Sequence, residues 1–125
     1  CFDDAMSAHA VADEISLLVK EANEDGYKME MYGGFHRPCK PHDEGQGKVF
    51  ALLEESCQDL DLAYSTQNSG GCCDGNNLAN LGLPNVDTMG VRGGGLHSND
   101  EFMVVESLVE RAALTAQFML NFARQ

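Results

Sequence analysis

Segments with the apolar spacing of helices alternate along this chain with short segments that have the character of strands. In Ser7–Asn23, apolar residues recur three and four positions apart, which predicts an amphipathic helix, and Gly26 follows as its end. The same spacing predicts further helices at Lys48–Leu60, at Asp74–Leu81 and from Ser107 onward. The apolar face of each helix needs a partner in the fold.

Strands are predicted between these helices, at residues 27–34, 61–66 and 83–91. The resulting order, α-β-α-β-α-β-α, favours an α/β fold in which helices flank a sheet. Ligands of such sheets bind at the loops beyond the strand ends. Two glycine-rich loops, Ser69–Asn77 and Gly90–Glu101, follow predicted strands, so we expect them to lie side by side at one edge of the sheet.

The last helix has features of its own. Ser107 and Glu110 have the S-x-x-E spacing of a capping box, in which each side chain bonds a free main-chain N–H at the helix start. One face of this helix is predicted to carry Leu108, Ala112, Thr115, Met119 and Phe122. On the helix predicted at Lys48–Leu60, Cys57 falls at a core position.

Composition excludes several kinds of partner. The 125 residues include 20 acidic and 8 basic ones, a formal net charge of −12, which disfavours nucleic acid and anionic membranes as partners. No apolar run approaches the roughly 20 residues of a membrane span, and we expect no signal peptide and a cytoplasmic location. The odd number of irregularly spaced cysteines favours free thiols in a reducing compartment (Cys1, Cys39, Cys57, Cys72 and Cys73).

The segment GVRGGGLHSNDE, residues 90–101, contains the sharpest candidate for chemistry, His97. A neutral imidazole is a good ligand for zinc, and the glycines beside it allow the main chain to approach a metal or substrate closely. Asp100 or Glu101 is expected to orient the second ring nitrogen. From composition and spacing alone, the simpler interpretation is a surface-loop histidine without a partner.

The segment SGGCCDGNN is a second candidate. Gly70 and Gly71 precede a predicted helix, so their N–H groups are suited to an anion, although the Walker A and GxGxxG patterns are absent. The alternative is a simple turn in which Asp74 caps the helix. Cys72 and its neighbour Cys73 lack an identifiable histidine base, so we expect small buried residues there.

Arg37, in the segment FHRP, is the third candidate. Its guanidinium is suited to hold a substrate carboxylate through a pair of hydrogen bonds. The alternative is an arginine that braces its own loop.

The stretch SGGCCDGNNLANLGLPNVDTMGVRGGGLHSNDEFMVVESLVERAAL strongly resembles the C-terminal end of the M20 metallopeptidases. Glutamate-carboxypeptidase-like members are the nearest in pattern, and the family includes acetylornithine deacetylase, succinyl-diaminopimelate desuccinylase and aminoacylase-type enzymes. The segment GGFHRPCKP resembles the return from the inserted lid domain to the catalytic domain. The resemblance covers essentially the whole chain.

The resemblance implies a fold and a domain division. Residues 1–32 look like the last helix and strand of an α+β lid or dimerisation domain. Residues 33–125 look like the C-terminal portion of a zinc-peptidase-like catalytic domain, a mixed sheet flanked by helices. The complete protein would be a homodimer.

The resemblance also implies a chemistry. It makes His97 one ligand of a two-metal site, usually zinc with cobalt or manganese possible, that activates water against an amide carbonyl with a glutamate as base. The implied substrate is a small peptide or N-acyl amino acid. Gly70, Gly71, Cys72 and Arg37 become candidate substrate contacts, although small Ser/Thr residues are common in the family where Cys72 and Cys73 stand.

Other elements of the family site are missing. The chain has no H-x-D motif, and its Glu54-Glu55 pair falls within a predicted helix of the C-terminal segment, the wrong place for the ligand-and-base pair. A metal site needs at least three protein ligands. We therefore expect a C-terminal fragment of an M20-type hydrolase that contains no catalytic residue, is inactive alone and tends to aggregate.

Two other hypotheses belong to different classes. In the first hypothesis, the chain is a non-catalytic α/β binding or assembly module that keeps the hydrolase scaffold. In the second it is a self-contained metal-binding protein, with ligands from His97, Asp100, Glu101 and Asp74.

Overall fold

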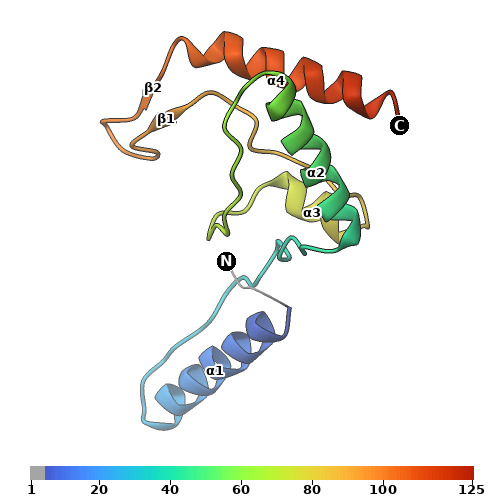
Figure 1. Ribbon diagram of the computed structural model, residues 1–125. Helices are drawn as coiled ribbons and strands as arrows, with labels where there is room; N and C mark the ends of the chain where they lie inside the picture. Colours follow the sequence, from blue (N-terminus) through green and yellow to red (C-terminus); the bar gives the residue numbers. More distant parts are fainter. Residues whose placement is uncertain (1–4) are drawn as a thin grey trace. The chain divides into compact units, whose positions relative to one another are not determined.

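Helices dominate the chain, and the only strands within residues 5–125 form one short hairpin (Figure 1). The computed structural model describes residues 5–125, with side chains from Ser7 onward. The elements are α1 (Ala5–Glu24), α2 (Glu44–Asp59), α3 (Asp74–Asn80), β1 (Gly93–Gly94), β2 (Phe102–Met103) and α4 (Ser107–Phe122). Helices are therefore combined with a sheet, as an α/β class predicts, but the sheet has two antiparallel strands.

The chain divides into two compact units. Of the described residues, the first unit holds those up to Pro41 together with Asn68–Leu83, and the second holds His42–Gln67 and Pro84–Gln125. The two glycine-rich loops belong to different units, so their expected placement at one edge of a sheet stays a prediction. Within residues 5–125, no helix is long and apolar enough to cross a membrane.

Helix α1 ends as its sequence predicts, but the segment after it is not a strand. Gly26 adopts φ +88°, and the N–H of Tyr27 donates to the carbonyl of Ala22 at 3.1 Å. The side-chain amide of Asn23 then bonds both main-chain groups of Met29, at 2.9 and 3.0 Å. The strand predicted at 27–34 is therefore wrong, because a helix side chain takes the place of a partner strand.

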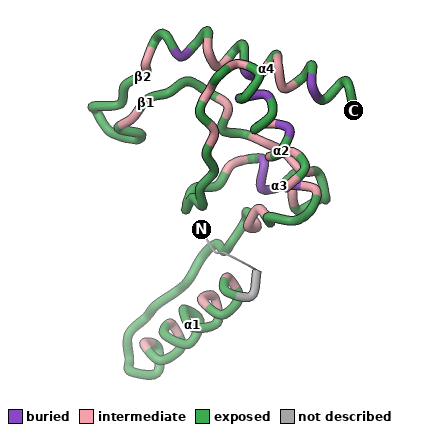
Figure 2. The backbone as a smooth tube through the Cα atoms, in the orientation of Figure 1, coloured by how far each residue is buried: buried purple, intermediate pink, exposed green. Residues whose placement is uncertain are grey.

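The core of the second unit lies between α2 and α4, which pack against each other (Figure 2). Leu52 and Cys57 of α2 are buried there, and Leu114 of α4 is only 2% exposed. This confirms the core position of Cys57, and burial raises the pKa of its thiol.

The face that α4 buries differs from the apolar face that its sequence indicates. The buried residues, Ser107, Leu114 and Asn121, recur every seven positions and so lie on one side of the helix. The predicted face carries large residues that are exposed, with Met119 at 65%. The apolar stripe is therefore not covered by the described residues of the second unit.

A polar network also joins α2 to α4. The amide of Asn121 donates to Ser56 Oγ at 3.1 Å and to Asp59 Oδ2 at 2.9 Å, and Gln117 Nε2 donates to the same carboxylate oxygen at 2.8 Å. These hydrogen bonds lower the pKa of Asp59 below its ordinary value. Buried polar groups at this interface are thus satisfied across the two helices.

Helix α2 begins earlier than predicted, at Glu44 instead of Lys48. The carboxylate of Asp43 accepts from the main-chain N–H of Gln46 at 2.8 Å and so caps the helix. The side chain of Gln46 also bonds both main-chain groups of Asn85, at 2.9 and 3.2 Å. The strand predicted at 83–91 is wrong for this reason, since its main chain is bonded by a helix side chain.

The strand predicted at 61–66 is also wrong. After α2, Asp61 adopts φ +55°, and the N–H of Leu62 returns to the carbonyl of Cys57 at 2.8 Å. This turn carries the chain away from the helix end without pairing it to another strand.

Candidate metal-ligand hairpin and substrate loop

The glycine run before His97 forms one leg of a β-hairpin. Gly93 pairs with Met103, and Gly94 pairs with Phe102. A Cβ at Gly93 would lie 2.2 Å from the carbonyl oxygen of Phe102, and Gly95 adopts φ +65°. The glycines therefore permit a close approach of the opposite leg of the hairpin, in addition to any approach to a ligand.

His97 lies in the loop that joins the two strands. Its residue is exposed and adopts φ +64°, in the left-handed region. The carboxylate of Glu101 accepts from the main-chain N–H of His97 at 3.4 Å. Glu101 therefore contacts the main chain of His97, and the predicted contact of Asp100 or Glu101 with the imidazole ring stays a prediction.

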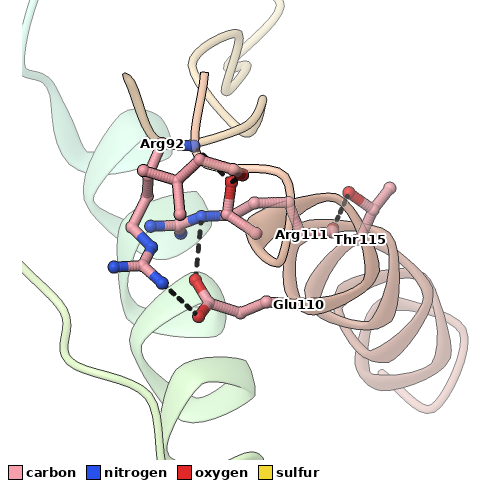
Figure 3. Close-up of polar contacts among 6 residues, drawn as sticks. Arg92, Glu110, Arg111 and Thr115 are labelled. Atoms are coloured by element: carbon pink, nitrogen blue, oxygen red, sulfur yellow. Dashed lines mark hydrogen bonds and ion pairs between the residues drawn. The ribbon is translucent and has the colours of Figure 1, made fainter. Parts of the chain in front are cut away.

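The base of the hairpin is joined to the start of α4. Ser107 Oγ accepts from the main-chain N–H of Arg92 at 2.9 Å and donates to the carbonyl of Val104 at 2.6 Å. The guanidinium of Arg92 pairs with Glu110 Oε2 at 3.2 Å, and the other oxygen of Glu110 lies 3.4 Å from Arg111 Nε (Figure 3).

These contacts replace the predicted capping box. The residue at the N-cap is Glu106, without a side-chain cap, and Ser107 is already helical. Both side chains of the S-x-x-E pattern, Ser107 and Glu110, contact Arg92 instead. The prediction fails because a residue distant in sequence competes for both groups.

The substrate candidates of the first unit lie around the start of α3. The guanidinium of Arg37 pairs with Asp74 Oδ1 at 2.9 Å, and Asn76 Nδ2 donates to the carbonyl of Pro38 at 2.9 Å. Two bonds thus fasten the Arg37 segment to the residues that follow Gly70 and Gly71. The salt bridge agrees with a bracing arginine, and a substrate role for Arg37 stays a prediction.

The loop before α3 is open to solvent. Gly70, Gly71 and Cys72 are exposed, and the N–H of Gly71 donates to Ser69 Oγ at 3.1 Å. Cys72 is therefore not the buried residue that its sequence predicted, and substrate contact by these residues stays a prediction.

The N-cap of α3 is Cys73, one residue before the predicted Asp74. The side chain of Asn76 accepts from the main-chain N–H of Cys73 at 3.0 Å. Sequence reasoning missed this role of Asn76, as well as its bond to Pro38. Cys39, Cys57, Cys72 and Cys73 are free thiols, and Cys1 lies outside the described residues.

Within the described residues, the predicted metal donor is His97, and no complete site is formed around it. His97 fits as a single ligand because its imidazole is exposed at the end of a hairpin. Among residues 5–125, no group of three or more His, Cys, Asp or Glu side chains is arranged to hold a metal. Asp74 belongs to the first unit and His97, Asp100 and Glu101 belong to the second, so a self-contained site built from these four residues stays a prediction.

Comparison with protein families gives an independent result. The model of Peptidase family M20/M25/M40 matches residues 5–121, which includes the hairpin, the α3 loop and α4. The chain belongs to this peptidase family. No curated protein and no solved structure gave a match. Membership of the M20 family indicates a hydrolase of the peptidase or amidohydrolase kind, and the family is generally dependent on metal, usually zinc.

Proposed function

We propose that this chain is the C-terminal part of a metal-dependent hydrolase of amide or peptide bonds, of carboxypeptidase or deacylase type, and that it is inactive alone. One observation carries the proposal. His97 stands on a glycine hairpin within the M20 match, while the described residues form no group of three or more potential metal ligands. The remaining ligands would come from residues outside this chain.

His97 would contribute a neutral imidazole to one of two zinc ions. Two such metal ions would supply a Lewis acid and an activated water for attack on an amide carbonyl. The contribution of this chain is to hold the imidazole in place and accessible. Zinc is the metal proposed first because imidazole suits it, with cobalt and manganese as alternatives.

Arg37 is proposed as a substrate contact on the basis of its present partner. Its guanidinium already holds one carboxylate, that of Asp74, and is 41% exposed. The carboxylate of a small peptide or an N-acyl amino acid is chemically equivalent to this partner. Gly70, Gly71 and Cys72 are proposed to line the same substrate because they precede α3 in an exposed loop.

The position of the Glu54-Glu55 pair supports inactivity of the isolated chain. Both residues are exposed on α2, a helix whose other side packs on α4. A ligand-and-base pair must lie beside the metal ligands, and the described residues form no group of three or more potential ligands around Glu54 and Glu55. The general base of the reaction is therefore proposed to lie in the remainder of the hydrolase.

The exposed apolar residues support the same proposal. Leu108, Met119 and Phe122 of α4 are large and exposed, an arrangement that isolated soluble domains rarely keep. We propose that the rest of the catalytic domain covers them and that the complete hydrolase is a cytoplasmic homodimer.

An amidase assay tests the proposal. The isolated 125-residue chain is incubated with zinc and a panel of dipeptides and N-acetyl amino acids, next to the longer hydrolase that carries this sequence. We expect no turnover by the chain alone. In the longer protein, His97→Ala should abolish turnover, and His9→Ala, a change of the same type on α1, should leave it intact. Metal-dependent turnover by the isolated chain that His97→Ala abolishes would contradict the proposal.

A further inference from the structure

Ser107 connects the two legs of the hairpin that carries His97. Its hydroxyl accepts from Arg92 N–H on the leg entering the hairpin and donates to the carbonyl of Val104 on the leg leaving it. Both functions of the hydroxyl are thereby used. Ser107 is 0% exposed, so water does not replace either bond readily.

The glycine leg has little else to fix its direction. Gly93, Gly94 and Gly95 have no side chains to pack, and glycine has more conformational freedom to lose than any other residue. The hairpin has only two residue pairs before the loop opens at Gly95. The orientation of the His97 loop therefore depends strongly on the contacts at its base.

A charged pair reinforces this base. Arg92 reaches α4 through its guanidinium at Glu110, while the N–H of Val104 donates to the Arg92 carbonyl at 2.8 Å. The second oxygen of Glu110 lies beside Arg111 of the same helix (Figure 3). Arg92 is thus held at its N–H, its carbonyl and its side chain.

We propose that Ser107 and Glu110 are positioning residues for His97. Together with Arg92 and Val104 they form a clasp, called here the Ser107 clasp, that sets the direction in which the hairpin leaves α4. The inference rests on the proposed function, in which His97 is a metal ligand. A metal ligand must be held within about half an ångström of its productive position, and supporting residues of this kind commonly control metal affinity.

Ser56 offers a matched control. It is also 0% exposed, lies in the same unit, and both donates, to the carbonyl of Leu52, and accepts, from Asn121. A change of Ser56 to alanine therefore removes the same kind of buried hydroxyl from the α2–α4 interface. It leaves the contacts of the Ser107 clasp intact.

The test compares Ser107→Ala with Ser56→Ala. In the 125-residue chain, hydrogen exchange is measured at the amides of Arg92 and Val104 and is corrected for the change in global stability of each variant. We expect these amides to exchange about tenfold faster in Ser107→Ala, and about as in wild type in Ser56→Ala. A smaller acceleration is expected in Glu110→Gln, which keeps the hydroxyl bridge.

The second readout is zinc affinity of the longer hydrolase, measured by competition with a chelator. Ser107→Ala should weaken zinc binding about tenfold, while Ser56→Ala leaves it unchanged. Equal exchange and equal zinc affinity in the two serine variants would overturn the clasp. Unchanged zinc affinity in His97→Ala would instead overturn the proposed function, and the amide exchange would still decide whether the clasp orients the hairpin.

Discussion

Helix α1 and the packed pair α2 and α4 have similar apolar patterns in their sequences. They differ in how far their apolar side chains are buried. In α2 and α4, side chains such as Leu52 and Leu114 are buried between the helices. In α1, whose side chains are described from Ser7 onward, no residue is buried and Leu18 is 59% exposed (Figure 2). An apolar stripe thus predicts that a segment is helical, whereas burial requires a partner that the stripe does not identify.

The largest effect is expected at the centre of the packed pair. Leu114→Ala removes a side chain that is 2% exposed and leaves a cavity, so unfolding should become easier by about 2–5 kcal/mol. Urea denaturation followed by circular dichroism measures this change. A loss below about 1 kcal/mol would show that α2 and α4 are loosely associated in solution.

A smaller loss is expected in the polar network. Asn121→Ala removes the amide that joins Ser56 and Asp59, so the free energy of unfolding should fall by about 1–3 kcal/mol. The control is Asn80→Ala at the exposed end of α3. If both variants lose the same stability, the network contributes nothing specific to the pairing of the helices.

The network should also make stability depend on pH. Hydrogen bonds from Asn121 and Gln117 lower the pKa of Asp59 below its ordinary value of 3.8. Because the unfolded chain then binds a proton more readily, the contribution of Asp59 is fully present above about pH 3.8 and is lost as pH falls through its lower folded pKa. Urea melts between pH 2 and 6 measure this change in the free energy of unfolding. The pH-dependent change should be lost in Asp59→Asn. If it is unaltered in that variant, it belongs to another carboxylate.

The smallest effect is expected in α1. Leu18→Ser changes a residue that is already 59% exposed, so the free energy of unfolding should change by less than about 0.5 kcal/mol. Parallel urea melts with Leu114→Ala give the contrast directly. A large loss in Leu18→Ser would contradict the exposure of this face of α1.

The helices were predictable from the sequence because their signals are local. Gly26 ends α1, and the segment at residues 74–80 is helical within one residue of its predicted end. The strands at 27–34, 61–66 and 83–91 were predicted wrongly because a strand exists only with a partner. Side chains such as Asn23 and Gln46 occupy the main-chain groups that a partner strand would need.

The family of the chain was predictable from the sequence of the candidate site. The motif around His97 pointed to the M20 family, and the family match agrees with it. The Ser107 clasp was not predictable, because its partner Arg92 lies 15 residues away and the local S-x-x-E pattern indicated a capping box. The assignments of Arg37 and the Gly70 loop to substrate stay predictions, and the structure pairs Arg37 with Asp74.

Metal content tests the central claim most directly, namely that this chain contributes one ligand to a site completed elsewhere. Wild-type chain, His97→Ala and the control His9→Ala are dialysed against trace zinc, and bound zinc is measured by atomic emission. We expect near-zero zinc in all of them, because a stable site needs at least about three protein ligands. About one or two zinc ions per wild-type chain, lost in His97→Ala and kept in His9→Ala, would contradict it.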